Sequence, residues 1–168
     1  DLARAASMGD ELLVPFFMGE RVPNLPDATA TLTGLRPGSL SPGVLYRAAL
    51  EGVALNLAAG VERMRGMGIE PEEVRLVGGA ARNPLWQEIL ATTFGVPVRV
   101  LMETETAAVG AALQAAAAAQ GEPADRIAQA FVAYGGPAVP PSTDAATVER
   151  LALLRGRLAE AVVAQRGA

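Results

Sequence analysis

The sequence predicts an α/β fold, in which short strands alternate with longer helices. The main observation is a strand, a helix, a second strand and a second helix in succession between Val74 and Gln120. That order favours a parallel pair of strands joined by a right-handed crossover. A length of 168 residues fits one domain, and hydrophobic residues make up 51% of the chain, enough for a buried core.

The first predicted elements are two short strands, Leu12 to Phe17 and Ala30 to Leu35. Both are rich in apolar and β-branched residues. The segment between them, Gly19 to Asp27, contains two prolines and a glycine. It therefore reads as an irregular loop.

A long helix is predicted next. Ser41 has the side chain of an N-cap, Pro42 suits the first helical position, and the helix should run to about Met64, where Gly66 and Gly68 stop it. Apolar and small residues recur at helical spacing, which predicts a stripe facing the core. The residues of this stripe are Leu45, Ala48, Ala49, Gly52, Leu55 and Ala59.

The second half of the chain contains the strand and helix pattern that defines the fold class. We expect strands at Val74 to Val77 and Val96 to Leu101, and helices at Pro84 to Phe94, Glu105 or Thr106 to Gln120, Arg126 to Ala133, and Thr143 or Asp144 to about Ala164. Gly121 to Asp125 and Gly135 to Ser142 read as loops.

Composition excludes several classes of protein. The formal net charge is −4, without a basic stripe, which argues against nucleic acid as a partner. The absence of cysteine and histidine excludes disulfides and thiolate or imidazole metal sites, and all 14 basic residues are arginine, so no P-loop lysine is present. The longest apolar stretch, Ala107 to Ala119, is too short to span a bilayer, so no membrane partner is expected.

The turn after Val77 is the strongest candidate for a binding site. Gly78 and Gly79 let the backbone bend and approach a ligand closely, and Asn83 followed by Pro84 predicts the start of a helix. Backbone N–H groups at such a turn suit a phosphate. The alternative is a plain tight connection between strand and helix.

Four sequence blocks together resemble the C-terminal half of the FGGY carbohydrate kinases, within their xylulose kinase branch, from about Leu12 to about Arg157. The blocks occur in the order and at the spacing of that family. They are PFFMGERVPNLPDA from Pro15, ATLTGLRPGSLSPGVLYRAALEG from Ala30, VGGAARNPLWQEILATTFGVPV from Val77 and ETETAAVGAALQAA from Glu103.

The resemblance implies an actin-like, ribonuclease H-like ATPase fold. Residues 1–168 would be the C-terminal nucleotide-binding domain of a sugar kinase, and the start of the chain reads as an internal position in a longer protein, with the N-terminal domain absent. The implied reaction transfers the γ-phosphoryl group of ATP, with Mg²⁺, to a sugar hydroxyl, by analogy that of D-xylulose. The resemblance assigns no catalytic residue and no metal ligand to this chain, which alone is expected to be inactive.

The resemblance also implies which residues would bind the nucleotide. Gly78, Gly79 and Ala80 would approach the α-phosphate and ribose, and Asn83 would reach adenine. Asn83 is also read as a helix cap, which is the favoured role, and both roles can hold together. Arg82 is the nearest cation and would either touch phosphate or remain solvated. Many family members carry a third glycine at the position of Ala80.

The proline-flanked loop supplies a second cluster. Glu20 and Arg21 would either line the cleft or form a local salt bridge that holds the loop, and the salt bridge is favoured. Asp27 is expected to bond backbone N–H groups rather than magnesium. Thr29 stands where the family commonly has arginine, in Ala-Arg-Gly, which weakens the sugar assignment more than the ATP assignment.

Two further residues are interpreted as structural. Glu51 lies inside the long helix, where a buried carboxylate needs a partner such as Arg47, four residues earlier. Trp86 is expected in the core, with a wall of the adenine pocket as the alternative.

Other functions remain to be weighed against the kinase. A non-catalytic, nucleotide-gated scaffold of actin-like fold is one, and kinases of gluconate, ribulose or glycerol are others. A dinucleotide-dependent oxidoreductase ranks last, because no G-x-G-x-x-G follows either strand. The resemblance is compatible with a homodimer and with a cytoplasmic protein, without excluding an organelle.

Overall fold

The computed structural model describes residues 2–6, 9–102 and 105–166. The first two residues of the fourth sequence block, Glu103 and Thr104, lie outside this part. The chain divides into two compact units. The first contains Asp1–Pro71, Thr92–Phe94 and Ser142–Ala168, and the second contains Glu72–Ala91 and Gly95–Pro141. The mixture of helices and short sheets confirms the predicted α/β class.

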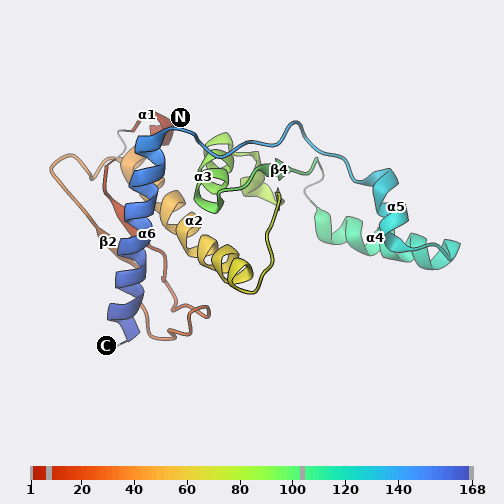
Figure 1. The fold of residues 1–168 in the computed structure, drawn as a ribbon, viewed down its shortest axis with the longest axis horizontal. Coiled ribbons are helices and arrows are strands. Elements are labelled where there is room, and N and C mark those ends of the chain that lie inside the picture. Colours follow the sequence, from red (N-terminus) through yellow and green to blue (C-terminus); the bar gives the residue numbers. More distant parts are fainter. Residues whose placement is uncertain (1, 7–8, 103–104, 167–168) are drawn as a thin grey trace. The chain divides into compact units, whose positions relative to one another are not determined.

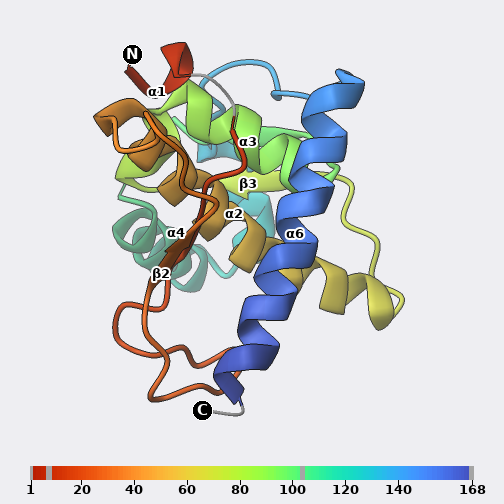
Figure 2. The same ribbon diagram turned by 90° about the vertical axis from the view of Figure 1, so that its left-hand side faces the viewer.

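The first unit is built on a two-stranded antiparallel sheet and three helices. Strand β1 (Leu12–Val14) pairs with β2 (Thr31–Thr33), and α1 (Leu2–Ala5), α2 (Pro42–Gly66) and α6 (Ala145–Arg166) complete the unit. Helices α2 and α6 both pack on β1 and on each other (Figures 1 and 2). The buried cluster that joins them consists of Leu12, Val14, Phe16, Leu25, Leu55, Leu154 and Leu158.

Both strands of this unit are shorter than predicted, for reasons visible in the sequence. Pro15 lacks the N–H that would continue the ladder beyond Val14. Gly34 has a φ of 79° and turns the chain away at the end of β2. The intervening loop is itself ordered by main-chain hydrogen bonds, since Glu20 and Leu25 exchange two of 2.8 Å each.

Helix α2 begins as expected and carries a slightly different core stripe. The Ser41 side chain accepts a hydrogen bond from the N–H of Val44, and Pro42 occupies the first helical position. Ala48, Gly52 and Leu55 are buried, whereas Ala59 is exposed. The buried stripe alternates steps of four and three residues from Val44 through Ala48, Glu51 and Leu55 to Ala58, so it keeps one face toward β1 and α6.

By length and composition alone, α2 is also apolar enough to cross a membrane, which the sequence analysis did not expect. Its most apolar 18-residue window has a mean hydropathy of 1.3, and 39% of that window is buried within the molecule. A core helix passes the same test. The packing of α2 against α1, β1 and α6 is that of a core helix.

The second unit contains the predicted parallel pair. Strand β3 (Val74–Leu76) pairs with β4 (Val98–Val100) in parallel, with Arg75 opposite Arg99. Between them in the chain lie the turn, a short 3₁₀ helix (Gly79–Arg82) and α3 (Pro84–Phe94), whose last three residues are counted with the first unit. Both predicted ends of α3 are confirmed. Gly95 ends α3 in the left-handed conformation, with a φ of 69°.

Helices α4 (Thr106–Gln120) and α5 (Ala124–Phe131) pack together after β4 (Figure 1). Helix α5 begins two residues before the predicted start, because Pro123 serves as its N-cap residue and its carbonyl accepts the N–H groups of Arg126 and Ile127. The proline-rich segment that follows is not a plain loop. Val139 bridges to Val98 of β4, and Tyr134 bridges to Leu101, the residue after β4.

Candidate functional site

The turn between β3 and α3 has the backbone that a ligand-approaching glycine pair requires. Gly78 has a φ of 86° and a ψ of −179°, a region that is open almost only to glycine. Gly79 does not share this conformation and instead begins the 3₁₀ helix. The conformational demand of the turn therefore falls on Gly78 alone.

The outer surface of the turn is open. A Cβ atom added at Gly78 or Gly79 would meet no atom within 4 Å. Gly79 and Ala80 are exposed, and within the described residues their N–H groups donate no hydrogen bond. Because the glycines have no packing reason to lack a side chain, the space beside them and the two amide donors are available to a ligand.

Asn83 is the N-cap of α3. Its Oδ1 accepts hydrogen bonds from the N–H of Leu85 at 3.0 Å and of Trp86 at 3.4 Å. Asn83 has a further interaction in the structure. The cap role is confirmed, while contact with adenine stays a prediction.

Arg82 and Trp86 differ in whether they are accessible to a ligand. Arg82 is exposed, and within the described residues it forms no ion pair, so its guanidinium is available to an anion near the turn. Trp86 is only 8% exposed, which confirms the interpretation as a core residue. The turn is tied to α3 by a bond that the sequence did not reveal, from Nε2 of Gln87 to the carbonyl oxygen of Ala81 at 2.7 Å.

The second candidate cluster, in the proline-flanked loop, is structural but not in the predicted way. The expected salt bridge between Glu20 and Arg21 does not form. Instead, Oε1 of Glu20 accepts the main-chain N–H groups of Arg21 at 2.7 Å and Val22 at 3.2 Å, and Oε2 accepts Nδ2 of Asn56 at 3.0 Å. Glu20 thus anchors the loop to α2.

These bonds also affect the charge of Glu20. Partial burial alone would raise the pKa of Glu20, but the hydrogen bonds from Val22, Arg21 and Asn56 outweigh it and hold the pKa below its ordinary value. The carboxylate is therefore ionised near neutral pH and occupied by the loop itself. It is a poor candidate for a proton acceptor.

Asp27 does not organise the turn as predicted. Its side chain is exposed, and within the described residues its carboxylate accepts no backbone N–H group. The loop is ordered instead by main-chain bonds, such as that from the N–H of Ala28 to the carbonyl oxygen of Leu25 at 3.2 Å. The carboxylate of Asp27 is consequently open to solvent and to ligands.

Glu51 is a buried structural anion, as predicted, with one partner more than predicted. Nε of Arg47 lies 2.9 Å from its Oε1, and Arg150 of α6 binds both carboxylate oxygens, with Nη2 2.5 Å from Oε2 and Nη1 3.0 Å from Oε1. Glu51 is 1% exposed. The fork of Arg150 suits this bidentate geometry and links α2 to α6.

The second unit also holds a basic pair, exposed Arg75 and half-buried Arg99, that no sequence pattern indicated. Arg75 and Arg99 both lie over the ring of Tyr134, at 5.7 Å and 4.9 Å from its centroid. Glu73 pairs with Arg99 at 2.6 Å and with Arg75 at 3.6 Å. The register of β3 and β4 brings the two arginines together, and one carboxylate and one ring compensate their charge.

Comparison with known proteins gives one family match. Residues 2–119 match the profile of the C-terminal domain of the FGGY family of carbohydrate kinases. The match includes the turn at Gly78 and ends before α5.

Individual relatives agree with this profile. Over 116 residues, covering 68% of this chain and 24% of the relative, the sequence is 36% identical to a xylulose kinase of Haemophilus influenzae. A stretch of 72 residues, 42% of this chain and 15% of the relative, is 43% identical to the L-fuculokinase of Escherichia coli. The crystal structure of xylulose kinase from Rhodospirillum rubrum superposes with a TM-score of 0.81 at 30% identity, covering 99% of this chain and 33% of that chain. The chain thus spans about a quarter of the length of the first relative.

Proposed function

Because the chain belongs to the FGGY family of carbohydrate kinases, as a C-terminal domain, we propose that it is the nucleotide-binding part of a sugar kinase. The proposed reaction is transfer of the γ-phosphoryl group of ATP to a sugar hydroxyl. The single observation that carries the proposal is the open turn at Gly78, Gly79 and Ala80, which lies inside the family match.

The residues of the turn fit a phosphate-bearing ligand. Gly79 presents no side chain to the approaching group, and the N–H groups of Gly79 and Ala80 can donate to phosphate oxygens. Arg82, at the end of the 3₁₀ helix, adds a positive charge. ATP supplies the transferable phosphoryl group, and these residues hold and orient it.

Asn83 contributes in two ways under this proposal. Its side chain caps α3 and so fixes the direction in which the turn enters the helix. The assignment of adenine to Asn83 rests on the resemblance of the block from Val77 to that of the family.

Mg²⁺ and the proton acceptor are not assigned to this chain. Within residues 2–6, 9–102 and 105–166, no group of three or more acidic side chains is placed to hold a metal ion. Magnesium would neutralise charge on the phosphates, and its protein ligands and the carboxylate that accepts the hydroxyl proton would come from the N-terminal domain.

D-xylulose is the proposed sugar. The xylulose kinase of H. influenzae and the structure from R. rubrum support it, while the L-fuculokinase match supports the class of sugar rather than one member. The turn contributes to nucleotide binding and does not discriminate between sugars.

A coupled ADP-release assay tests the proposal on the natural full-length protein that contains this sequence. The protein is incubated with ATP, Mg²⁺ and a panel of D-xylulose, L-fuculose, D-ribulose, gluconate and glycerol. We expect sugar-dependent ADP release, fastest with D-xylulose. ATP binding without ADP release on any member of the panel would favour the non-catalytic scaffold and contradict the kinase.

A further inference from the structure

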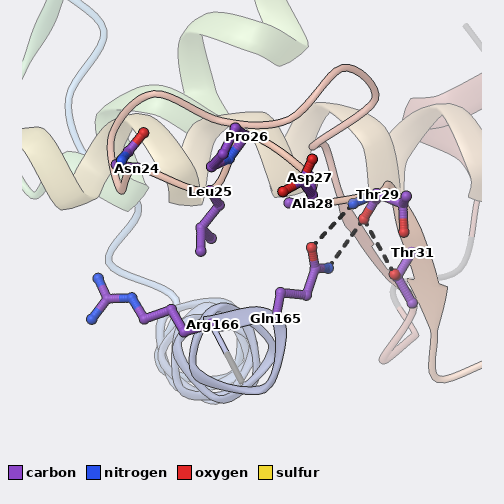
Figure 3. A pocket seen from close by; sticks show the side chains of 9 residues that line it. All are labelled: Asn24, Leu25, Pro26, Asp27, Ala28, Thr29, Thr31, Gln165 and Arg166. Carbon is purple, nitrogen blue, oxygen red and sulfur yellow. Dashed lines mark hydrogen bonds between the residues drawn. The ribbon is translucent and has the colours of Figure 1, made fainter. Parts of the chain in front are cut away.

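A hollow of about 510 Å³ lies in the first unit, between the proline-flanked loop and the end of α6 (Figure 3). It is formed by residues 24–29, Thr31 and two residues of α6, Gln165 and Arg166. Its volume is in the range of about 300–1,000 Å³ that is typical of small-molecule sites. The turn at Gly78, Gly79 and Ala80 does not line this hollow.

The two sides of the hollow are fixed to each other. The side-chain amide of Gln165 bonds the main chain of Thr29 in both directions, because Nε2 donates to the Thr29 carbonyl at 3.1 Å and Oε1 accepts the Thr29 N–H at 3.2 Å (Figure 3). The loop itself is held by Glu20 through its bonds to Asn56 and to the main chain. The hollow is therefore preformed, although its walls are more than 130 positions apart in the sequence.

Three polar side chains of the lining have no partner within the described residues. They are the amide of Asn24, the carboxylate of Asp27 and the guanidinium of Arg166. A guanidinium binds phosphate with two parallel hydrogen bonds, and a carboxylate can accept hydroxyl groups. All three side chains are exposed, so the lining offers one cation, one anion and one amide to a small molecule that has both an anionic group and several hydroxyls.

Arg166 is the cation of this lining, and Thr29 lines the same hollow. Arg166 comes from α6, which lies beyond the family match. The positive charge of the hollow is thus supplied by the helix that Gln165 ties to the loop.

We propose that this hollow is a second small-molecule site, separate from the nucleotide turn, for a polyol that carries a phosphate group. Arg166 binds the phosphate, and Asp27 and Asn24 bind hydroxyls. The choice of a sugar phosphate rests on the proposed function, whereas the anionic group is inferred from Arg166 itself.

A cysteine reporter in the hollow tests this proposal. The chain has no cysteine, so Thr31→Cys places one thiol of this sequence in the lining. In the natural full-length protein, the alkylation rate of the Cys-bearing peptide is followed by mass spectrometry with D-xylulose 5-phosphate, D-xylulose or inorganic phosphate. We expect D-xylulose 5-phosphate to slow alkylation at the lowest concentration, phosphate at a higher one, and D-xylulose to have little effect.

Matched variants then assign the anion to Arg166. Arg166→Ala should raise the half-protecting concentration of D-xylulose 5-phosphate about tenfold or more, since a hydrogen bond to a charged group is lost. Arg21→Ala removes an equal charge from the loop that forms the other wall, at a position outside the lining, and should leave protection unchanged. Adding Thr29→Arg to Arg166→Ala should restore protection. Thermal melts show whether each variant is folded.

The outcomes separate this site from the proposed function. If D-xylulose 5-phosphate does not protect folded Thr31→Cys from alkylation, the proposed site is overturned, whereas the kinase proposal is unaffected. Equal effects of Arg166→Ala and Arg21→Ala on protection would have the same meaning. Protection by D-xylulose equal to that by its phosphate would overturn the role of Arg166. Protection in a protein that releases no ADP would support the site and refute the kinase.

Discussion

Gly79 and Gly78 should respond differently to substitution, and this difference separates ligand binding from backbone strain. Gly79 lies in the 3₁₀ helix without a positive φ, and an added Cβ would meet no atom within 4 Å. We therefore expect Gly79→Val to leave the free energy of unfolding nearly unchanged. The added branched side chain would occupy the space in which we place the phosphate.

The magnitudes follow from these positions. Gly79→Val in the full-length protein should raise the KM for ATP by about tenfold or more, which is roughly 1.4 kcal/mol, with little change in the KM for the sugar. Gly78→Ala should instead lower the stability by about 1–3 kcal/mol, because alanine is strained at a φ of 86°. The sequence assigned the bend to both glycines, whereas the structure places the positive φ at Gly78 and not at Gly79.

The assay combines ADP release at varied ATP with a thermal melt of each variant. Gly79→Val that melts like the wild type but requires more ATP supports the site. If Gly79→Val melts like the wild type and has the wild-type KM for ATP, the turn does not approach the nucleotide and the reasoning is refuted.

Three further predictions concern other residues of the chain. Asn83→Ala should cost about 1 kcal/mol of stability through loss of the cap of α3, while Asn83→Ser should keep the cap. Urea unfolding measures the cap in both variants, and ATP titration of the same variants measures any contact with adenine. Equal stability of Asn83→Ala and wild type would contradict the cap. Glu51→Ala should destabilise by about 3–5 kcal/mol, measured by urea unfolding, because the largely buried Arg47 and Arg150 lose their shared carboxylate. A loss typical of a surface substitution would show that the network is not needed. Because the pKa of Glu20 is lowered in the folded state, its carboxylate should stabilise the protein at pH values above its ordinary pKa of 4.5 and lose this effect as pH falls through the lower folded pKa. Glu20→Gln should therefore be less stable than wild type at pH 7, and the difference should shrink in acid. A difference in stability that does not change with pH would contradict this.

Local signals in the sequence were sufficient for the parts of the fold that depend on neighbouring residues. Pro84 and Gly95 bound α3 at both predicted ends, because proline and glycine limit the backbone at those positions directly. Ser41 and Asn83 cap their helices for the same local reason. The positions of the turn after β3 and of its glycines followed from this local pattern as well.

Contacts between distant segments were beyond such signals. Arg150 meets Glu51 across 99 positions and Gln165 meets Thr29 across 136, and nothing near either residue indicates its partner. The predicted partner of Glu20 was wrong for a related reason, since Arg21 was adjacent in sequence but Asn56 of α2 was in reach in space. Val77 is 44% exposed although its side chain is apolar, because the burial of a residue depends on which distant segments cover it.

A crystal structure of the natural full-length protein with ADP and Mg²⁺ tests the central claim most directly. The account predicts phosphate oxygens within hydrogen-bond distance of the N–H groups of Gly79 and Ala80, beside the open face of Gly78. Nucleotide bound elsewhere, with this turn in contact only with solvent, would contradict it.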